Sequence, residues 1–122
     1  MIKVSQRNPT DCGVCCLAML LKLPYEKVAQ TVFVDYALRR DFSIRFEELK
    51  EILKSFGKEA EAYAAFGSGP AINGILEISY TEKGLEKWHY LVWDAAVQEF
   101  LDPRSIPFKG EFKKRRFVGV LR

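Results

Sequence analysis

Three residues with chemically active side chains occupy distinct places in this chain. Cys12 comes just before an apolar stretch, the single histidine, His89, lies in a run of aromatic and branched residues, and Asp102 follows it. A thiol, an imidazole and a carboxylate are the groups that activate the nucleophile in cysteine hydrolases. We therefore expect Cys12 to act as a nucleophile if the fold brings these three residues together.

The stretch after Cys12 predicts a buried helix. Residues 13–23 contain no proline and are rich in Leu, Ala, Met and Cys. Thr10 or Asp11 is expected to cap this helix, which would place Cys12 in its first turn. Because a helix N-terminus and a nearby imidazolium both stabilise a thiolate, the pKa of Cys12 is expected to be lowered. Activity would then follow a bell-shaped pH profile.

The surroundings of His89 predict a β-hairpin. Alternation along the strand divides residues 88–93 between two faces; the first face carries His89, Leu91 and Trp93, and the second carries Trp88, Tyr90 and Val92. A turn at residues 94–96 would return the chain as a strand over residues 97–101, with residue 101 about opposite His89. Asp102 would then lie beside His89. A lone histidine in a strand is usually a packed core or edge residue, but the presence of Cys12 and Asp102 favours a catalytic role here.

Gln6 is the fourth candidate site residue. It lies six positions before Cys12, in a segment expected to be extended. Its side-chain amide and the backbone N–H of Cys12 together could stabilise the oxyanion of a tetrahedral intermediate. A glutamine near the start of a chain is usually a surface residue, so its spacing from Cys12 carries this hypothesis.

These motifs resemble, in order and spacing, those of the C39 peptidase family, papain-like cysteine peptidases best known as leader-cleaving domains of bacteriocin exporters. The resemblance extends from Gln6 to about Pro103, and the matching segments are Gln6, DCGVCCLAM from Asp11, FSIRFEEL from Phe42, LKSFG from Leu53, GPAI from Gly69, HYLV from His89 and LDP from Leu101.

The resemblance implies roles for the four site residues. Cys12 would be the nucleophile, His89 the general base and acid, Asp102 the residue that orients His89, and Gln6 the oxyanion donor. It also implies a papain-like α+β fold with N-terminal helices packed on a C-terminal antiparallel sheet. Cys16 matches a family cysteine without a catalytic role, and we expect it to pack in the core. No role is predicted for Cys15.

The implied reaction is hydrolysis of a peptide or isopeptide bond in a peptide or protein substrate, through an acyl-thioester. A double-glycine-type site is one candidate for the position of the cleaved bond. Leader-processing relatives are usually fused to a membrane transporter, so a transporter or a host protein would here be a separate partner. Two alternatives stay open. The same residues could serve an acyl-transfer or transglutaminase-like enzyme, or the chain could be a C39-like peptide-binding module without catalysis.

Metal and disulfide chemistry fit the cysteines poorly. Structural zinc needs four ligands, whereas the three thiols crowd on one helix beside a single histidine. We therefore expect no metal and no cofactor. An odd number of neighbouring thiols also argues against a disulfide scaffold, and free thiols suit a reducing compartment.

Composition predicts one domain over residues 1–122, with 48% hydrophobic residues and a net charge of +3. No apolar signal segment precedes residue 7 and no stretch is long enough to span a membrane, so a cytoplasmic location is expected. The basic run Lys113, Lys114, Arg115 and Arg116 is interpreted as a solvated strand edge that discourages sheet pairing. Binding of nucleic acid or of an acidic protein surface by this run is less favoured.

The remaining elements follow from periodicity and turn residues. Helices are predicted at residues 25–38 and 43–56, the second with Ser43 near a capping box. Strands are predicted at residues 59–65, 71–80 and 117–121, with a polar hairpin loop at residues 81–87.

Overall fold

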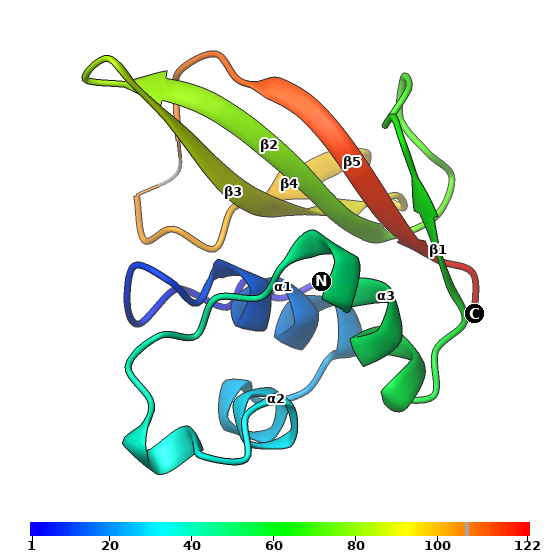
Figure 1. The fold of residues 1–122 in the computed structure, drawn as a ribbon. Coiled ribbons are helices and arrows are strands. Elements are labelled where there is room, and N and C mark those ends of the chain that lie inside the picture. Colours follow the sequence, from blue (N-terminus) through cyan, green and yellow to red (C-terminus); the bar gives the residue numbers. More distant parts are fainter. Residues whose placement is uncertain (107) are drawn as a thin grey trace.

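Helices occupy the first half of the chain and strands the second half. The computed structural model describes residues 1–106 and 108–122. The helices are α1 (Cys12–Leu21), α2 (Tyr25–Val32), the 3₁₀ turn η1 (Tyr36–Leu38) and α3 (Phe46–Ser55). The strands are β1 (Ala60–Tyr63), β2 (Gly74–Glu82), β3 (Leu85–Asp94), β4 (Glu99–Leu101) and β5 (Lys113–Val120). The helices form one layer and the sheet the other (Figure 1). This is the α+β, papain-like arrangement that the sequence predicts.

All strand pairs in the sheet are antiparallel, in the order β1-β5-β2-β3-β4. The longest pairing joins β2 to β3 and extends from Gly74 opposite Trp93 to Glu82 opposite Leu85. The predicted alternation in β3 is confirmed. Tyr90 and Val92 belong to the core beneath the helices, whereas Leu91 and Trp93 belong to an aromatic cluster on the opposite face.

Helix α1 lies at the centre of the core, as its apolar sequence predicts. Seven of its residues are buried, including Cys15 and Cys16. The predicted cap is wrong, because neither Asp11 nor Thr10 caps the helix with its side chain. The Thr10 hydroxyl instead accepts a hydrogen bond from the Phe42 N–H, and Asp11 binds groups outside the helix.

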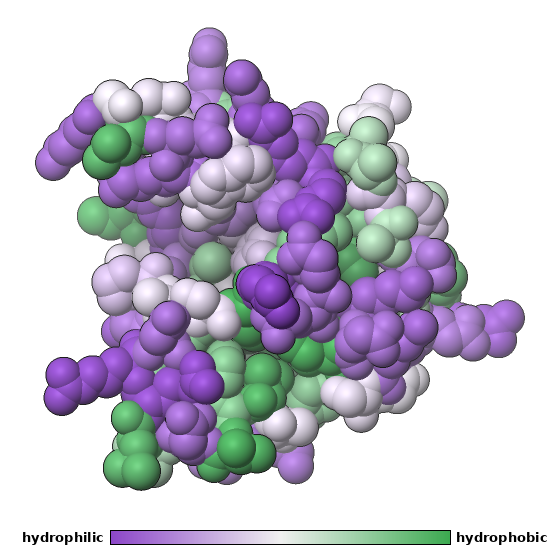
Figure 2. All heavy atoms as spheres, viewed as in Figure 1, coloured by the Kyte–Doolittle hydropathy of each residue, from purple (hydrophilic) through white to green (hydrophobic). Residues whose placement is uncertain are grey.

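Helix α2 ends at Val32, six residues earlier than predicted. The chain becomes extended at Phe33 and then forms η1, so the predicted helix is divided. Val34 and Leu38 are almost fully exposed in this segment. Figure 2 shows hydrophobic side chains at the lower left of the molecule, where this segment lies.

Helix α3 begins at Phe46, three residues later than predicted. The Glu48 side chain accepts a hydrogen bond from the N–H of Arg45, the residue that precedes the helix. Ser43 is therefore not the cap, and its N–H donates to Asp41. The amphipathic pattern itself is confirmed, since Leu49 and Leu53 are fully buried.

The loop predicted at residues 81–87 is wrong. Strands β2 and β3 continue through most of it and meet at a two-residue turn made of Lys83 and Gly84. Both turn residues have positive φ angles, 53° at Lys83 and 77° at Gly84, as tight hairpin turns require. The longer hairpin places Trp88 in a paired part of β3, opposite Ser79, rather than beside a loop.

Strand β5 begins four residues earlier than predicted, with the basic run. As a strand it is interior rather than an edge, since it lies between β1 and β2. However, β1 pairs only with residues 117–120, so the basic run has a neighbouring strand on one side only. Within the described residues, no helix is long and apolar enough to cross a membrane.

Candidate active site

Cys12 is the first residue of α1 and lines a cleft of about 260 Å³ between the helices and the sheet. The cleft is lined by Pro9, Thr10, Cys12, Ser43, Ile44, Glu77, Trp88, His89 and Tyr90. The adjacent Gly13 allows a close approach here, because a Cβ atom at this position would lie 3.2 Å from the Cβ of Ile44. Cys12 and His89, 77 positions apart in the sequence, therefore share one cleft.

His89 and Asp102 form a hydrogen bond across the sheet. The His89 Nε2 and the Asp102 Oδ1 lie 2.8 Å apart, and both side chains are almost buried. Asp102 is itself fixed by two backbone groups, because Oδ1 accepts from the Arg104 N–H and Oδ2 from the Phe108 N–H. A carboxylate held in this way fixes the tautomer and the orientation of the imidazole.

The expected partner of His89 is therefore present, but the expected register is wrong. The turn after β3 is longer than residues 94–96, so Leu101 lies opposite Val92 rather than opposite His89. Strand β4 ends at Leu101, and Asp102 reaches His89 diagonally.

Asp102 is ionised at neutral pH. Its partial burial acts to raise the pKa, but hydrogen bonds from His89, Phe108 and Arg104 outweigh burial and lower the pKa below its usual value. The imidazole therefore faces an anion, which stabilises an imidazolium when His89 takes up a proton.

The Cys12 thiol is neutral in this state, which corrects the expectation of a lowered pKa. Burial raises the pKa of Cys12 to about 11, and the Asp11 carboxylate adds to this effect. Hydrogen bonds from the backbone of Tyr90, Gly13 and Cys12 itself act in the opposite direction, but they do not outweigh burial. The N–H groups at the start of α1 therefore lower the pKa of Cys12, as predicted. The loss of solvent around the thiol raises this pKa by more.

Gln6 lies beside the Asp102 segment. Its backbone N–H donates to the Pro103 carbonyl at 2.6 Å, and its side-chain Nε2 donates to the Asn8 carbonyl at 3.1 Å. Its side chain lines a separate hollow with Arg104 and Ser105, not the Cys12 cleft. A primary amide carries two N–H groups, so one donor remains after the bond to Asn8.

Asp11 is a functional candidate that the sequence interpretation assigned only as a cap. It is fully buried, and its Oδ2 accepts hydrogen bonds from the Arg7 N–H at 2.9 Å and the Tyr25 hydroxyl at 2.8 Å. Its Oδ1 is buried without a partner. Asp11 therefore ties the segment that carries Gln6 to α2, directly before Cys12. The position of Asp11 in the motif DCG could have marked it as a functional candidate. The motif does not show which groups Asp11 binds.

A second group that the sequence interpretation missed is an ion-pair bridge on the cleft wall. Arg116 binds both carboxylate oxygens of the buried Glu77, at 2.9 and 3.1 Å, and binds Glu47 at 2.8 Å. The bridge joins β2, β5 and α3. No signal in the sequence pairs Glu77 with Arg116, because their contact depends on strand register.

Cys15 and Cys16 are both fully buried, which confirms the prediction of core packing for Cys16. Burial raises the pKa of Cys15 to about 12 and holds that of Cys16 well above its usual value. All three cysteines are free. Among residues 1–106 and 108–122, no group of three His, Cys, Asp or Glu side chains is arranged to hold a metal ion.

The fold and this cleft are those of a papain-like cysteine peptidase family. The sequence model of the Peptidase C39 family matches residues 2–101 of the 122-residue chain, a span that contains Gln6, Cys12 and His89 and ends just before Asp102. The chain therefore belongs to the peptidase C39 family. No curated protein and no solved structure matches it significantly.

Proposed function

We propose that the chain is a cysteine peptidase that hydrolyses a peptide or isopeptide bond, with Cys12 as nucleophile, His89 as general base and acid, and Asp102 as the orienting residue. The observation that carries this proposal is the 2.8 Å contact between His89 and Asp102 in a cleft that also contains Cys12. Family membership supports the same reaction class.

In the proposed reaction, the Cys12 sulfur attacks the carbonyl carbon of the scissile bond while His89 takes the thiol proton. The bond between carbon and nitrogen then breaks, and His89 returns the proton to the leaving amine. Water hydrolyses the resulting thioester and regenerates the thiol. Because the thiol is neutral in the free protein, removal of its proton by His89 accompanies substrate binding rather than preceding it.

The oxyanion is proposed to bind the Cys12 backbone N–H and the remaining N–H of the Gln6 side chain. Gln6 is close enough to the catalytic segment for its backbone to bind Pro103, next to Asp102. Its side chain would need to turn from Asn8 towards the cleft. Such a donor typically contributes about 10²–10³-fold to turnover.

The substrate is proposed to be an extended peptide with small residues at the cleaved bond, of which a double-glycine-type site is one. Support comes from the size of the cleft, about 260 Å³, and from the bulky Ile44 and Tyr90 that line it. A separate transporter or a host protein could present such a peptide.

A peptide library prepared from a cell lysate tests the proposal. New peptide ends should appear with the wild-type chain and with Cys15→Ala, the matched control, but not with Cys12→Ala. Absence of cleavage by the wild type, or equal cleavage by Cys12→Ala, would contradict it. Added glycinamide distinguishes acyl transfer, because a transferase would join it to the new C-terminus.

A further inference from the structure

Arg115 and Arg116 lie in a β-bulge beside the cleft. Leu76 pairs with Phe117 and Ile78 with Lys114, so two residues of β5 lie opposite the single residue Glu77. In a regular strand these neighbouring arginines would point to opposite faces. Here Arg116 binds Glu77 and Arg115 binds Ser79, and these two partners lie two positions apart on the same face of β2. The bulge therefore directs both guanidinium groups to one face.

The two arginines differ in how their charge is compensated. Arg116 is bound by the carboxylates of Glu77 and Glu47. The Arg115 Nε donates to the hydroxyl of the buried Ser79 at 2.8 Å, and among the described residues no carboxylate forms an ion pair with Arg115. Its two terminal nitrogen groups are therefore available to an anion, whereas those of Arg116 are already used.

The Arg115 guanidinium lies over the ring of Trp88. The Arg115 Cζ lies 5.1 Å from the centroid of the Trp88 ring. Trp88 lines the cleft that contains Cys12, precedes His89 in β3 and is about half exposed. The aromatic face of Trp88 and the hydrogen bond that Nε donates to Ser79 together fix the plane of the guanidinium, which reduces the entropy lost when it binds a ligand.

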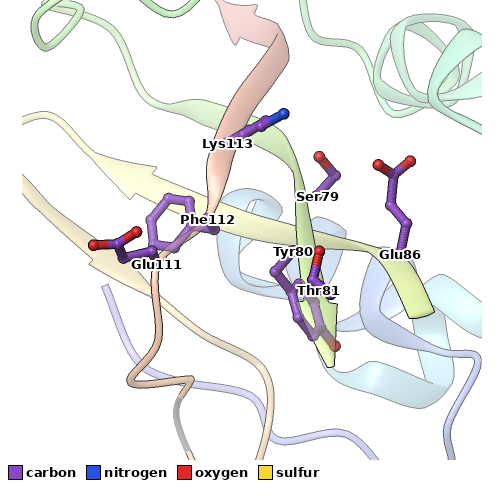
Figure 3. Close-up of a pocket in the computed structure, with 7 residues that line it drawn as sticks. All are labelled: Ser79, Tyr80, Thr81, Glu86, Glu111, Phe112 and Lys113. Carbon is purple, nitrogen blue, oxygen red and sulfur yellow. The ribbon is translucent and has the colours of Figure 1, made fainter. Parts of the chain in front are cut away.

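A second hollow lies farther along β2 and β3, where Ser79 and Glu86 line it two positions from Glu77 and Trp88 of the cleft. It has a volume of about 510 Å³ and is lined by Ser79, Tyr80, Thr81, Glu86, Glu111, Phe112 and Lys113. Figure 3 shows Ser79 and Glu86 projecting to one side of the sheet, with the Lys113 ammonium directed towards them. Glu86 lies two positions before Trp88 on the same face of β3, and Lys113 lines the same hollow as Glu86.

We propose that Arg115, held between Ser79 and Trp88, binds a carboxylate group of the peptide that occupies the Cys12 cleft. The inference rests on the proposed peptidase function and adds to it a recognition element. A carboxylate matches the two terminal guanidinium nitrogens, which donate parallel hydrogen bonds. The carboxylate belongs either to an acidic side chain or to the free C-terminus of the peptide.

Binding is measurable without turnover. The chain has two tryptophans, and the Trp93 indole is bound to the Pro70 carbonyl on the opposite face of the sheet. In ¹⁵N-labelled Cys12→Ala protein, the Trp88 indole resonance therefore reports the site and the Trp93 resonance serves as an internal control. The probes are acetylated, amidated tetraglycine peptides with Glu or Gln at each position in turn, and acetyl-triglycine with a free or an amidated C-terminus.

We expect one acidic probe to shift the Trp88 resonance and to bind about three- to tenfold more tightly than its neutral match. Arg115→Gln should abolish this difference, Arg115→Lys should retain part of it, and Lys113→Gln, the matched control, should leave it intact. Equal affinity of every acidic and neutral pair, or a preference that survives Arg115→Gln, would overturn the proposal.

The outcomes separate this inference from the peptidase proposal. Cleavage of library peptides by the wild type, without an acidic preference in binding, would overturn the role of Arg115 alone. Selective binding of acidic probes without any cleavage would overturn the peptidase function and leave a peptide-binding module. A preference for the Glu probes identifies an internal acidic residue, and a preference for the free triglycine identifies a C-terminus.

Discussion

The His89 imidazole and the Asp102 carboxylate lie 2.8 Å apart, although Asp102 comes after the end of β4 and not opposite His89 in the sheet. The N–H groups of Arg104 and Phe108 hold Asp102 in place, so the loop after β4 positions the carboxylate. The contact between His89 and Asp102 therefore depends on the loop as much as on the strands.

Replacement of Asp102 by asparagine should lower kcat/KM by roughly 10²–10⁴-fold, because the amide fixes the wrong tautomer and no longer stabilises the imidazolium. Kinetics on a peptide identified in the library measure this effect, with Asp94→Asn as a control at another buried carboxylate. Unchanged kcat/KM in Asp102→Asn would show that the contact is only structural.

The neutral Cys12 thiol predicts a particular pH dependence for alkylation. Because the pKa is raised to about 11, the thiolate fraction is small at neutral pH and increases until the pH passes the pKa. The rate with iodoacetamide should therefore rise about tenfold per pH unit between about pH 7 and 9. Mass spectrometry should locate the label at Cys12 and not at Cys15 or Cys16. A rate that is already constant across this range would indicate a preformed thiolate–imidazolium pair.

Asp11 should have opposite effects on stability and on thiol reactivity. Asp11→Asn removes a negative charge that contributes to the raised pKa of Cys12, so alkylation at about pH 8 should become faster. The same change weakens the bonds from Arg7 and Tyr25, which should reduce the free energy of unfolding by roughly 1–3 kcal/mol. Tyr25→Phe is the matched control: it should destabilise the fold without accelerating alkylation.

The bridge at Arg116 should matter for stability mainly through Glu77. Arg116→Met leaves a buried carboxylate without its bidentate partner and should cost roughly 1–3 kcal/mol in the free energy of unfolding. Glu47→Gln removes only an exposed partner and should cost less. Urea unfolding of both variants measures the difference. Equal losses would show that the contact with Glu47 in α3, rather than the buried charge of Glu77, accounts for the stabilisation.

Elements with strong periodicity could be predicted from the sequence, and their ends could not. The apolar stretch after Cys12, the amphipathic α3 and the alternation in β3 determined which faces are buried. The end of α2 and the turn at Lys83 and Gly84 depend on how the chain packs, because their sequences permit more than one backbone path.

The sequence by itself determined which chemical groups are present: a thiol at a helix start, one histidine in a buried strand, a later aspartate and the motifs of the C39 family. Only the tertiary structure decided their state. Burial opposes ionisation of Cys12, a loop positions Asp102, and a bulge turns Arg115 towards Trp88. Desolvation and strand register arise from contacts between distant segments, and local sequence does not encode such contacts.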